Sequence, residues 1–150
     1  GLVDEADAIG CTIYYLDTDA DSFGVMGTTQ CLCAPVYPYT ATKAGDCNDS
    51  DPGVNPDMVE VCNGKDDNCN NIIDEEDATG CKTYYKDNDD DSYGLTADSK
   101  CLCLPSNPYD AANDGDCNDA VNTTYPGAPE LCDNVDNDCD NLPISFWACA

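Results

Sequence analysis

Apolar residues in this chain form short runs rather than long periodic stretches. Two of these runs each contain two tyrosines and at least one β-branched residue, a composition that favours a β-strand. They are Thr12–Leu16 and Lys82–Lys86. After each run come an acidic loop, an extended segment around two cysteines, a Pro/Tyr segment and a second acidic half. We expect one helical turn at Glu60–Cys62 and at Glu130–Cys132. The pattern predicts short β-strands, one-turn helices and mostly loops.

These features occur twice, because Cys11 corresponds to Cys81 and the following positions align without a gap. The matched positions are cysteine, acidic, amide, glycine, proline and tyrosine residues, whereas the aliphatic positions vary. A unit of about 70 residues buries little surface, so disulfides and bound ions should provide most of its stability. The sequence predicts a segment 1–10 that matches the end of a repeat, repeat 1 at 11–80, repeat 2 at 81–141 and an apolar tail at 142–150.

The charge balance is strongly acidic. Thirty-one acidic residues against five basic ones give a formal net charge of -26, and the chain has no histidine. Such a charge needs cations to neutralise it, and it argues against nucleic acid and anionic membranes as partners. Low hydrophobicity with high charge is typical of disorder, but thirteen cysteines and nine tyrosines argue against that interpretation. No run is long and apolar enough for membrane insertion.

The cysteine content is that of disulfide-rich secreted proteins, which predicts a secreted, extracellular or cell-surface location. A thiolate cluster of the zinc or copper type is less favoured, because most cysteines lie far apart and histidine is absent. We expect pairs within each repeat, with Cys47 bonded to Cys69, and Cys149 left over. The predicted disulfide residues are Cys11, Cys31, Cys33, Cys47, Cys62 and Cys69, with Cys81, Cys101, Cys103, Cys117, Cys132 and Cys139.

One acidic stretch has the ligand spacing of an EF-hand-like calcium loop. Oxygen-bearing side chains stand at places one, three, five and nine, and place seven offers a backbone carbonyl. Place six is Asn71 rather than glycine, and asparagine can also reach a left-handed backbone. The predicted ligands are Asp66, Asn68, Asn70, Ile72 and Asp74 in repeat 1, with Asp136, Asp138 and Asp140 in repeat 2.

The loop after each β-prone run repeats this spacing. Place six is serine, which carries a backbone penalty if the left-handed conformation is required. No glutamate stands at place twelve, so the remaining ligands must come from elsewhere, with Asp46 and Asp49 as candidates. The predicted ligands are Asp17, Asp19, Asp21 and the carbonyl of Phe23, with Asp87, Asp89, Asp91 and the carbonyl of Tyr93.

The second acidic half brings further oxygens beside a cysteine. The additional predicted ligands are Asp46, Asn48, Asp49 and Glu60, with Asp116, Asn118, Asp119 and Glu130. The alternative is that all these segments are solvated acidic loops. Flexible all-oxygen loops favour Ca²⁺ over Mg²⁺. The predicted fold is therefore a small, disulfide-rich, calcium-stabilised tandem repeat.

Three segments carry a resemblance to a known family: Gly-Asp-Cys-Asn-Asp, the turn Pro126–Cys132 and Asp136–Asp140. They resemble the MopE-type metal-binding repeat of secreted and surface proteins. The Tyr-Tyr-x-Asp-x-Asp-x-Asp segment is similar to the aspartate-rich loops of thrombospondin type 3 repeats. The resemblance implies extracellular calcium-binding arrays without enzymatic activity. The chain departs from the pattern in its extra cysteines and in having Asn63-Gly64 where Asp-Gly is usual.

Both ends of the chain look like parts of a calcium loop. Residues 1–10 match residues 71–80, which makes Asp4 the counterpart of Asp74 and a candidate ligand. We expect residues 1–5 of one chain to complete the loop of residues 136–140 in the next, giving head-to-tail self-association or an array of neighbouring repeats. The alternatives are a chain cut from a longer array and a tail that folds back.

The leading functional prediction is a secreted structural repeat protein that binds calcium: a spacer, surface-array or filament subunit. The alternative is a calcium-dependent adhesin or glycan-binding module with exposed tyrosines. An enzyme is not expected, because the chain has no histidine, nucleophile motif or phosphate loop, although a glycosidase-type carboxylate pair is not excluded by counting. Asn122-Thr123-Thr124 is a glycosylation sequon, so Asn122 is a candidate site in a host that glycosylates.

Overall fold

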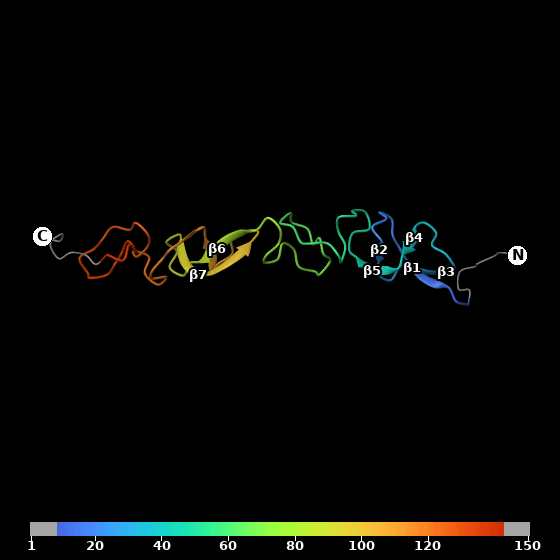
Figure 1. Cartoon of the computed structure of the whole chain (residues 1–150), viewed down its shortest axis with the longest axis horizontal. Helices are drawn as coiled ribbons and strands as arrows, with labels where there is room; N and C mark the ends of the chain where they lie inside the picture. The colour runs from blue at the N-terminus through green and yellow to red at the C-terminus, as the bar shows by residue number, and fades with distance from the viewer. Residues whose placement is uncertain (1–8, 143–150) are drawn as a thin grey trace. The chain divides into compact units, whose positions relative to one another are not determined.

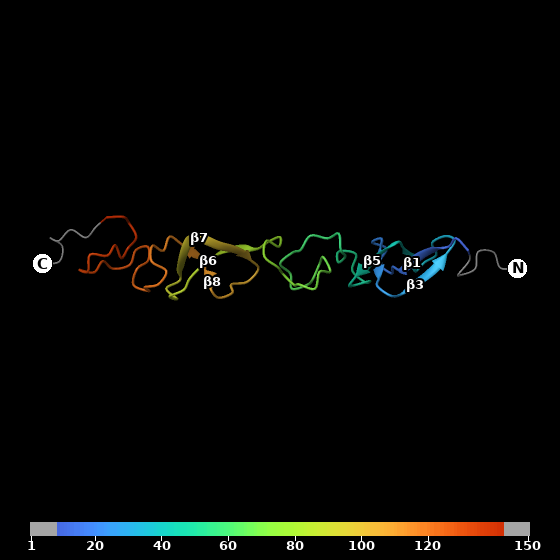
Figure 2. The same cartoon turned by 90° about the horizontal axis from the view of Figure 1, so that it is seen from below.

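The computed structural model describes residues 9–142, which form two compact units that divide between Asp74 and Glu75. Each unit contains one copy of the strand-and-loop pattern, and residues 75–80, which were predicted to end repeat 1, belong to the second unit. Figures 1 and 2 show that the strands gather in one part of each unit and that loops make up the rest. The described residues contain no helix, so no element of this part of the chain is a helix able to cross a membrane.

Five short strands build unit 1. A central strand, β1, pairs antiparallel with a strand on each side, in the order β3-β1-β4, and a separate parallel pair joins β2 to β5. The first acidic loop lies between β1 and β2. The bounds are β1 Thr12–Leu16, β2 Phe23–Val25, β3 Thr29–Leu32, β4 Tyr39–Ala41 and β5 Lys43–Asp46.

Unit 2 repeats this arrangement with one difference. Its β7 runs without a break through the region that β2 and β3 share in unit 1, so one sheet forms in the order β8-β6-β7-β9. The bounds are β6 Lys82–Lys86, β7 Tyr93–Leu102, β8 Tyr109–Ala111 and β9 Asn113–Asp114. The two strands predicted from the tyrosine-containing runs are thus confirmed as β1 and β6.

The helical turns predicted at Glu60–Cys62 and Glu130–Cys132 are wrong, because both segments are non-helical. The reason is competition from side chains for the backbone donors. Val61 N–H donates to an Asp67 carboxylate oxygen at 3.2 Å, and Leu131 N–H donates to the Asn137 amide oxygen at 2.9 Å. Side-chain acceptors of this kind replace the carbonyls that a helical turn would use.

The buried interior is more polar than apolar. The described residues include six buried hydrophobic side chains and ten buried polar or charged ones, and Phe23 is the only aromatic residue in the first group. An apolar core of this size stabilises little. The buried polar residues are Asp17, Asp46, Asn55, Glu60, Asp67, Asp87, Asp116, Asp119, Thr124 and Asn137.

Disulfides link the parts of each repeat. Cys47 is bonded to Cys69 as predicted, and the matching pair joins Cys117 to Cys139. The other defined pairs are Cys11–Cys31 and Cys81–Cys101, and Cys62, Cys103 and Cys132 are also disulfide-bonded. Cys149 lies outside the described residues. The disulfides therefore tie the strands and the acidic loops of each repeat into one framework.

Candidate metal centre

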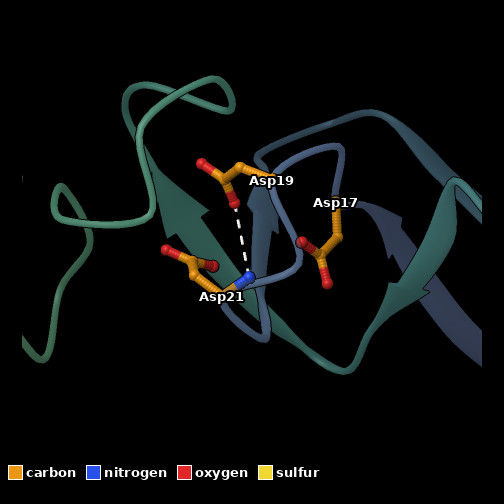
Figure 3. Close-up of side chains that lie close together, drawn as sticks. All are labelled: Asp17, Asp19 and Asp21. Carbon is orange, nitrogen blue, oxygen red and sulfur yellow. Dashed lines mark hydrogen bonds between the residues drawn. The ribbon is translucent and has the colours of Figure 1, made fainter.

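Three carboxylates meet in the loop that follows β1. Asp17, Asp19 and Asp21 each offer an oxygen, and the three oxygens lie within 4.8 Å of one another (Figure 3). Asp17 comes directly after β1 and is buried, and its backbone N–H donates to the carbonyl of Pro38 at 2.7 Å. Asp87, Asp89 and Asp91 form the same group after β6. We call residues 17–23 and 87–93 the A loops.

The second acidic loops, residues 66–72 and 136–142, have the same backbone conformation as the A loops at two places. We call them the B loops. Places four and six have a positive φ in all four loops. Ser22 at place six of the first A loop has a φ of 80°, and Asn71 in the first B loop has a φ of 71°. The left-handed conformation anticipated for these two residues is therefore present. The other residues with this geometry are Ala20, Cys69, Asp90, Ser92, Cys139 and Asn141.

One hydrogen bond also recurs in all four loops. The backbone N–H at place seven donates to the side-chain oxygen at place five, for example from Phe23 to Asp21 at 2.7 Å. This local turn fixes the place-five oxygen that accepts the bond. The remaining pairs are Ile72 to Asn70 at 2.7 Å, Tyr93 to Asp91 at 2.9 Å and Leu142 to Asp140 at 2.7 Å.

The first A loop receives two carboxylates from the second acidic half, as anticipated. Asp46 ends β5, and Asp19, Asp46 and Asp49 each offer an oxygen within 4.8 Å of the others. Both oxygens of Asp49 accept from Thr18, so Asp49 also anchors the loop. One oxygen of Asp46 accepts the Asn48 N–H at 2.7 Å, and the other is buried without a donor.

Buried carboxylate oxygens without a hydrogen-bond donor distinguish the A loops from ordinary acidic turns. Such oxygens lose water and gain nothing in return, which is costly for a charged group. In repeat 1 they belong to Asp17, Asp19 and Asp46. In repeat 2 they belong to Asp89, Asp91 and Asp116.

The same environment shifts the ionisation of these groups. Burial, followed by the charge of Asp21, raises the pKa of Asp19. Burial is also the main cause that raises the pKa of Asp46, Asp89, Asp91 and Asp116, and neighbouring carboxylates add to it. A bound cation would remove both causes, since it replaces lost water and neutralises the repulsion.

In the first B loop the predicted ligands already accept hydrogen bonds. The carboxylate of Asp66 accepts the N–H groups of Asn70 at 3.0 Å and Asn71 at 2.8 Å. Asp74 accepts N–H groups from residues 63 and 64 at 2.9 and 3.0 Å. In the second B loop Glu130, Asp136 and Asp138 have oxygens within 4.8 Å of one another, and desolvation raises the pKa of Asp138.

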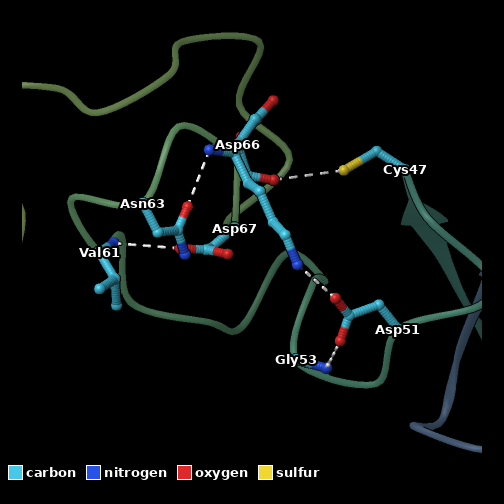
Figure 4. Close-up of polar contacts among 8 residues, drawn as sticks. Cys47, Asp51, Gly53, Val61, Asn63, Asp66 and Asp67 are labelled. Atoms are coloured by element: carbon cyan, nitrogen blue, oxygen red, sulfur yellow. Dashed lines mark hydrogen bonds and ion pairs between the residues drawn. The ribbon is translucent and has the colours of Figure 1, made fainter.

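Glu60 is a predicted ligand that makes several structural contacts. One carboxylate oxygen accepts the N–H groups of Asp67 at 3.1 Å and Asn68 at 3.3 Å, and the other accepts the Asp74 N–H at 3.0 Å. Buried Asp67 in turn accepts from the backbone of Val61 and the amide of Asn63 (Figure 4). The sequence reasoning missed Asp67 and its counterpart Asn137, although both stand at place two of a B loop.

Other predicted residues lie at the margin of these clusters or beyond them. Asn48 and Asn118 are exposed, as is the sequon residue Asn122. The carbonyls of Phe23, Ile72 and Tyr93 remain predicted ligands, and Asp119 is a buried acceptor for Asn88. Asp4 lies outside the described residues.

Comparison with known proteins identifies part of each repeat. Residues 46–75 and 116–142 match the model of the Cu-binding MopE family, which is described as a "putative metal-binding motif". No curated protein and no solved structure matches the chain. The matched segments contain the B loops together with Asp46 and Asp116, and the A loops lie outside them. The chain therefore carries two copies of the MopE-type metal-binding motif, one in each repeat.

Proposed function

We propose that this chain is a calcium-binding structural module in which bound cations hold the acidic loops of each repeat in place. The observation that carries the proposal is the set of buried carboxylate oxygens without donors around each A loop. Because the three carboxylates of each A loop each offer an oxygen within 4.8 Å of the others, a single cation can contact more than one carboxylate. A cation bound by oxygens from both halves of a repeat would then cross-link those halves.

The donor set favours Ca²⁺ over the copper in the family's name. Copper sites in proteins use imidazole, thiolate or thioether ligands. The chain has no histidine, and the cysteines of the matched segments are all disulfide-bonded. One thioether, Met58, lies in the matched segments, and repeat 2 has Ala128 at that position, so the motif does not depend on it. The donors common to both repeats are carboxylate, amide and carbonyl oxygens, which hard cations prefer, and a flexible loop suits the variable coordination of Ca²⁺ better than the strict octahedron of Mg²⁺.

Location and role follow from the same features. Disulfides persist in oxidising compartments, which supports a place outside the cell or on its surface. With a small apolar core and loops tied by ions and disulfides, each repeat suits a spacer, a surface array or a filament. Head-to-tail association belongs to this proposal, although the terminal segments 1–8 and 143–150 lie outside the described residues. Filaments visible by electron microscopy in Ca²⁺ would support it, and uniform monomers at high concentration would refute it.

Direct binding tests the choice of ion. Isothermal titration of the oxidised, chelator-treated chain should show saturable heat with Ca²⁺, much weaker binding of Mg²⁺, and no stoichiometric binding of Cu²⁺. The double variant Asp19→Asn/Asp46→Asn should lose Ca²⁺ equivalents, whereas Asp57→Asn, an exposed partner of Lys43, should keep them all. Binding of Mg²⁺ as tight as that of Ca²⁺, or unchanged Ca²⁺ equivalents in the double variant, would refute the proposal.

A further inference from the structure

The two A loops differ at one position that contacts a predicted ligand. In repeat 1 the buried side chain of Asn55 donates from Nδ2 to an oxygen of Asp21 at 2.8 Å. The amide oxygen of Asn55 accepts the Asp57 N–H at 3.0 Å, which fixes the direction of the donor. Asp21 therefore has both oxygens occupied, since its other oxygen accepts from Phe23.

Repeat 2 has Tyr125 at the corresponding position. Its ring stacks on the ring of Tyr93, with centroids 5.4 Å apart and an interplanar angle of 12°. No side-chain amide is offered to Asp91, the counterpart of Asp21. One Asp91 oxygen accepts the Tyr93 N–H, and the other is buried without a donor. The same carboxylate is thus satisfied in repeat 1 and unsatisfied in repeat 2.

The backbone around this position is equivalent in both repeats. Asn55 N–H donates to the carbonyl of Asp67 at 2.9 Å, and Tyr125 N–H donates to the carbonyl of Asn137 at 2.9 Å. The three A-loop carboxylates converge within 4.8 Å in both repeats. Because repeat 2 reaches this geometry without the amide, Asn55 is not required to position Asp21. Its main effect is to stabilise the ion-free carboxylate.

The charged residues near the two A loops also favour cation binding in repeat 2. Asp90 and Asp110 line one pocket of about 330 Å³ together with Asp87 of the second A loop. Their counterparts in repeat 1 are the neutral residues Ala20 and Thr40. Repeat 1 also carries Lys43, but Asp57 neutralises it in an ion pair at 2.7 Å, and repeat 2 has the neutral residues Asn113 and Gly127 at these positions, so the charge difference comes from Asp90 and Asp110. A cation is therefore attracted more strongly to the second A loop.

We propose that the A loop of repeat 2 binds Ca²⁺ more tightly than the A loop of repeat 1, and that Asn55 lowers the affinity of repeat 1 by acting as an internal substitute for the cation. This inference rests on the proposed function. Since a hydrogen bond to a charged group contributes enough to change an equilibrium about tenfold or more, the two loops fill at different Ca²⁺ concentrations. Residue 55 and its counterpart 125 then set the order of filling.

Nuclear magnetic resonance resolves the two loops in one sample. In the oxidised, ¹⁵N-labelled full chain the amides of Phe23 and Tyr93 each donate to the place-five carboxylate of their own loop. With free Ca²⁺ set by a chelator buffer, the Tyr93 amide should shift at about tenfold lower Ca²⁺ than the Phe23 amide. Asn55→Leu keeps the shape and removes the donor, so it should move the Phe23 midpoint to lower Ca²⁺.

Controls separate this inference from folding effects and from the proposed function. Asn55→Ala should act like Asn55→Leu, and Tyr125→Phe, which keeps the stacked ring, should leave both midpoints unchanged. Equal midpoints in the unmodified chain, or a Phe23 midpoint that stays or rises in Asn55→Leu, would overturn the inference alone. If neither amide responded to Ca²⁺, the proposed function would fail as well.

Discussion

Asp46 combines properties that a solvated acidic residue lacks. It is 6% exposed, one of its oxygens has no donor, and burial raises its pKa. Without a cation its charge destabilises the fold, because buried charge is neither hydrated nor paired. With a cation the same charge becomes a ligand. The sign of its contribution therefore depends on the ion.

Replacing Asp46 should change stability in opposite directions with and without Ca²⁺. In chelator Asp46→Asn removes an unpaired buried charge and should raise the free energy of unfolding by about 1 kcal/mol, which is roughly 4–8 °C in melting temperature for a unit of this size. In saturating Ca²⁺ it removes a ligand and should lower the melting temperature. Thermal denaturation of the oxidised chain in both buffers measures this.

Asp57→Asn is the matched control, because Asp57 is exposed and its ion pair with Lys43 lies on the surface. Exposed ion pairs contribute little to stability, so this variant should change the free energy of unfolding by no more than about 0.5 kcal/mol in either buffer. A decrease for Asp46→Asn in both buffers would mean that Asp46 is a structural acceptor rather than a ligand.

At the scale of the elements, Glu60 anchors the backbone of the first B loop and of the residues that follow it. Its carboxylate accepts three backbone N–H groups, from Asp67, Asn68 and Asp74. Glu60→Gln replaces one acceptor oxygen by a donor that faces those groups. We expect it to lower the free energy of unfolding by about 1–3 kcal/mol in Ca²⁺ and in chelator alike.

Chemical denaturation in the two buffers distinguishes the structural role of Glu60 from a ligand role. A loss of stability confined to the Ca²⁺ buffer would show that Glu60 acts as a ligand, as the sequence spacing suggested. Glu130→Gln provides the comparison in repeat 2, where Glu130 accepts two backbone N–H groups, from Asn137 and Asp138.

Local spacing predicts the loops well, because alternate ligand positions and β-prone runs are short-range signals. Strands β1 and β6 and the convergence of Asp17, Asp19 and Asp21 follow from it directly. The roles of Asn55 and Asp67 do not, since they depend on contacts between segments distant in sequence. Periodicity could not exclude the helical turn at Glu60–Cys62, because the competing acceptor, Asp67, belongs to the B loop.

For the whole molecule, the net charge of -26 and the small apolar core make stability depend on pH and on ions together. Several carboxyl groups have raised pKa values, so the ion-free folded chain binds more protons than the unfolded chain just above pH 3.8. They belong to Asp19, Asp46, Asp89, Asp91 and Asp116. Stability in chelator should therefore rise as the pH falls through these raised values, and be lost again as the pH rises.

In Ca²⁺ stability should instead decrease as the pH falls, because protons compete with the cation for the same oxygens. Denaturation curves recorded between about pH 7 and about pH 4 should then converge for the two buffers at the acidic end. Parallel pH profiles in Ca²⁺ and chelator would show that the carboxylates with raised pKa do not bind the ion.

We propose that cations, together with disulfides, hold the two repeats folded. The most direct measurement is a thermal melt of the oxidised chain in Ca²⁺, in Mg²⁺ and in chelator at neutral pH. We predict a large fall in melting temperature in chelator and little recovery in Mg²⁺, since the loops offer flexible oxygen ligands. An unchanged melting temperature in chelator would mean that disulfides alone hold the fold and that the acidic loops are only solvated, and it would refute ion-dependent folding.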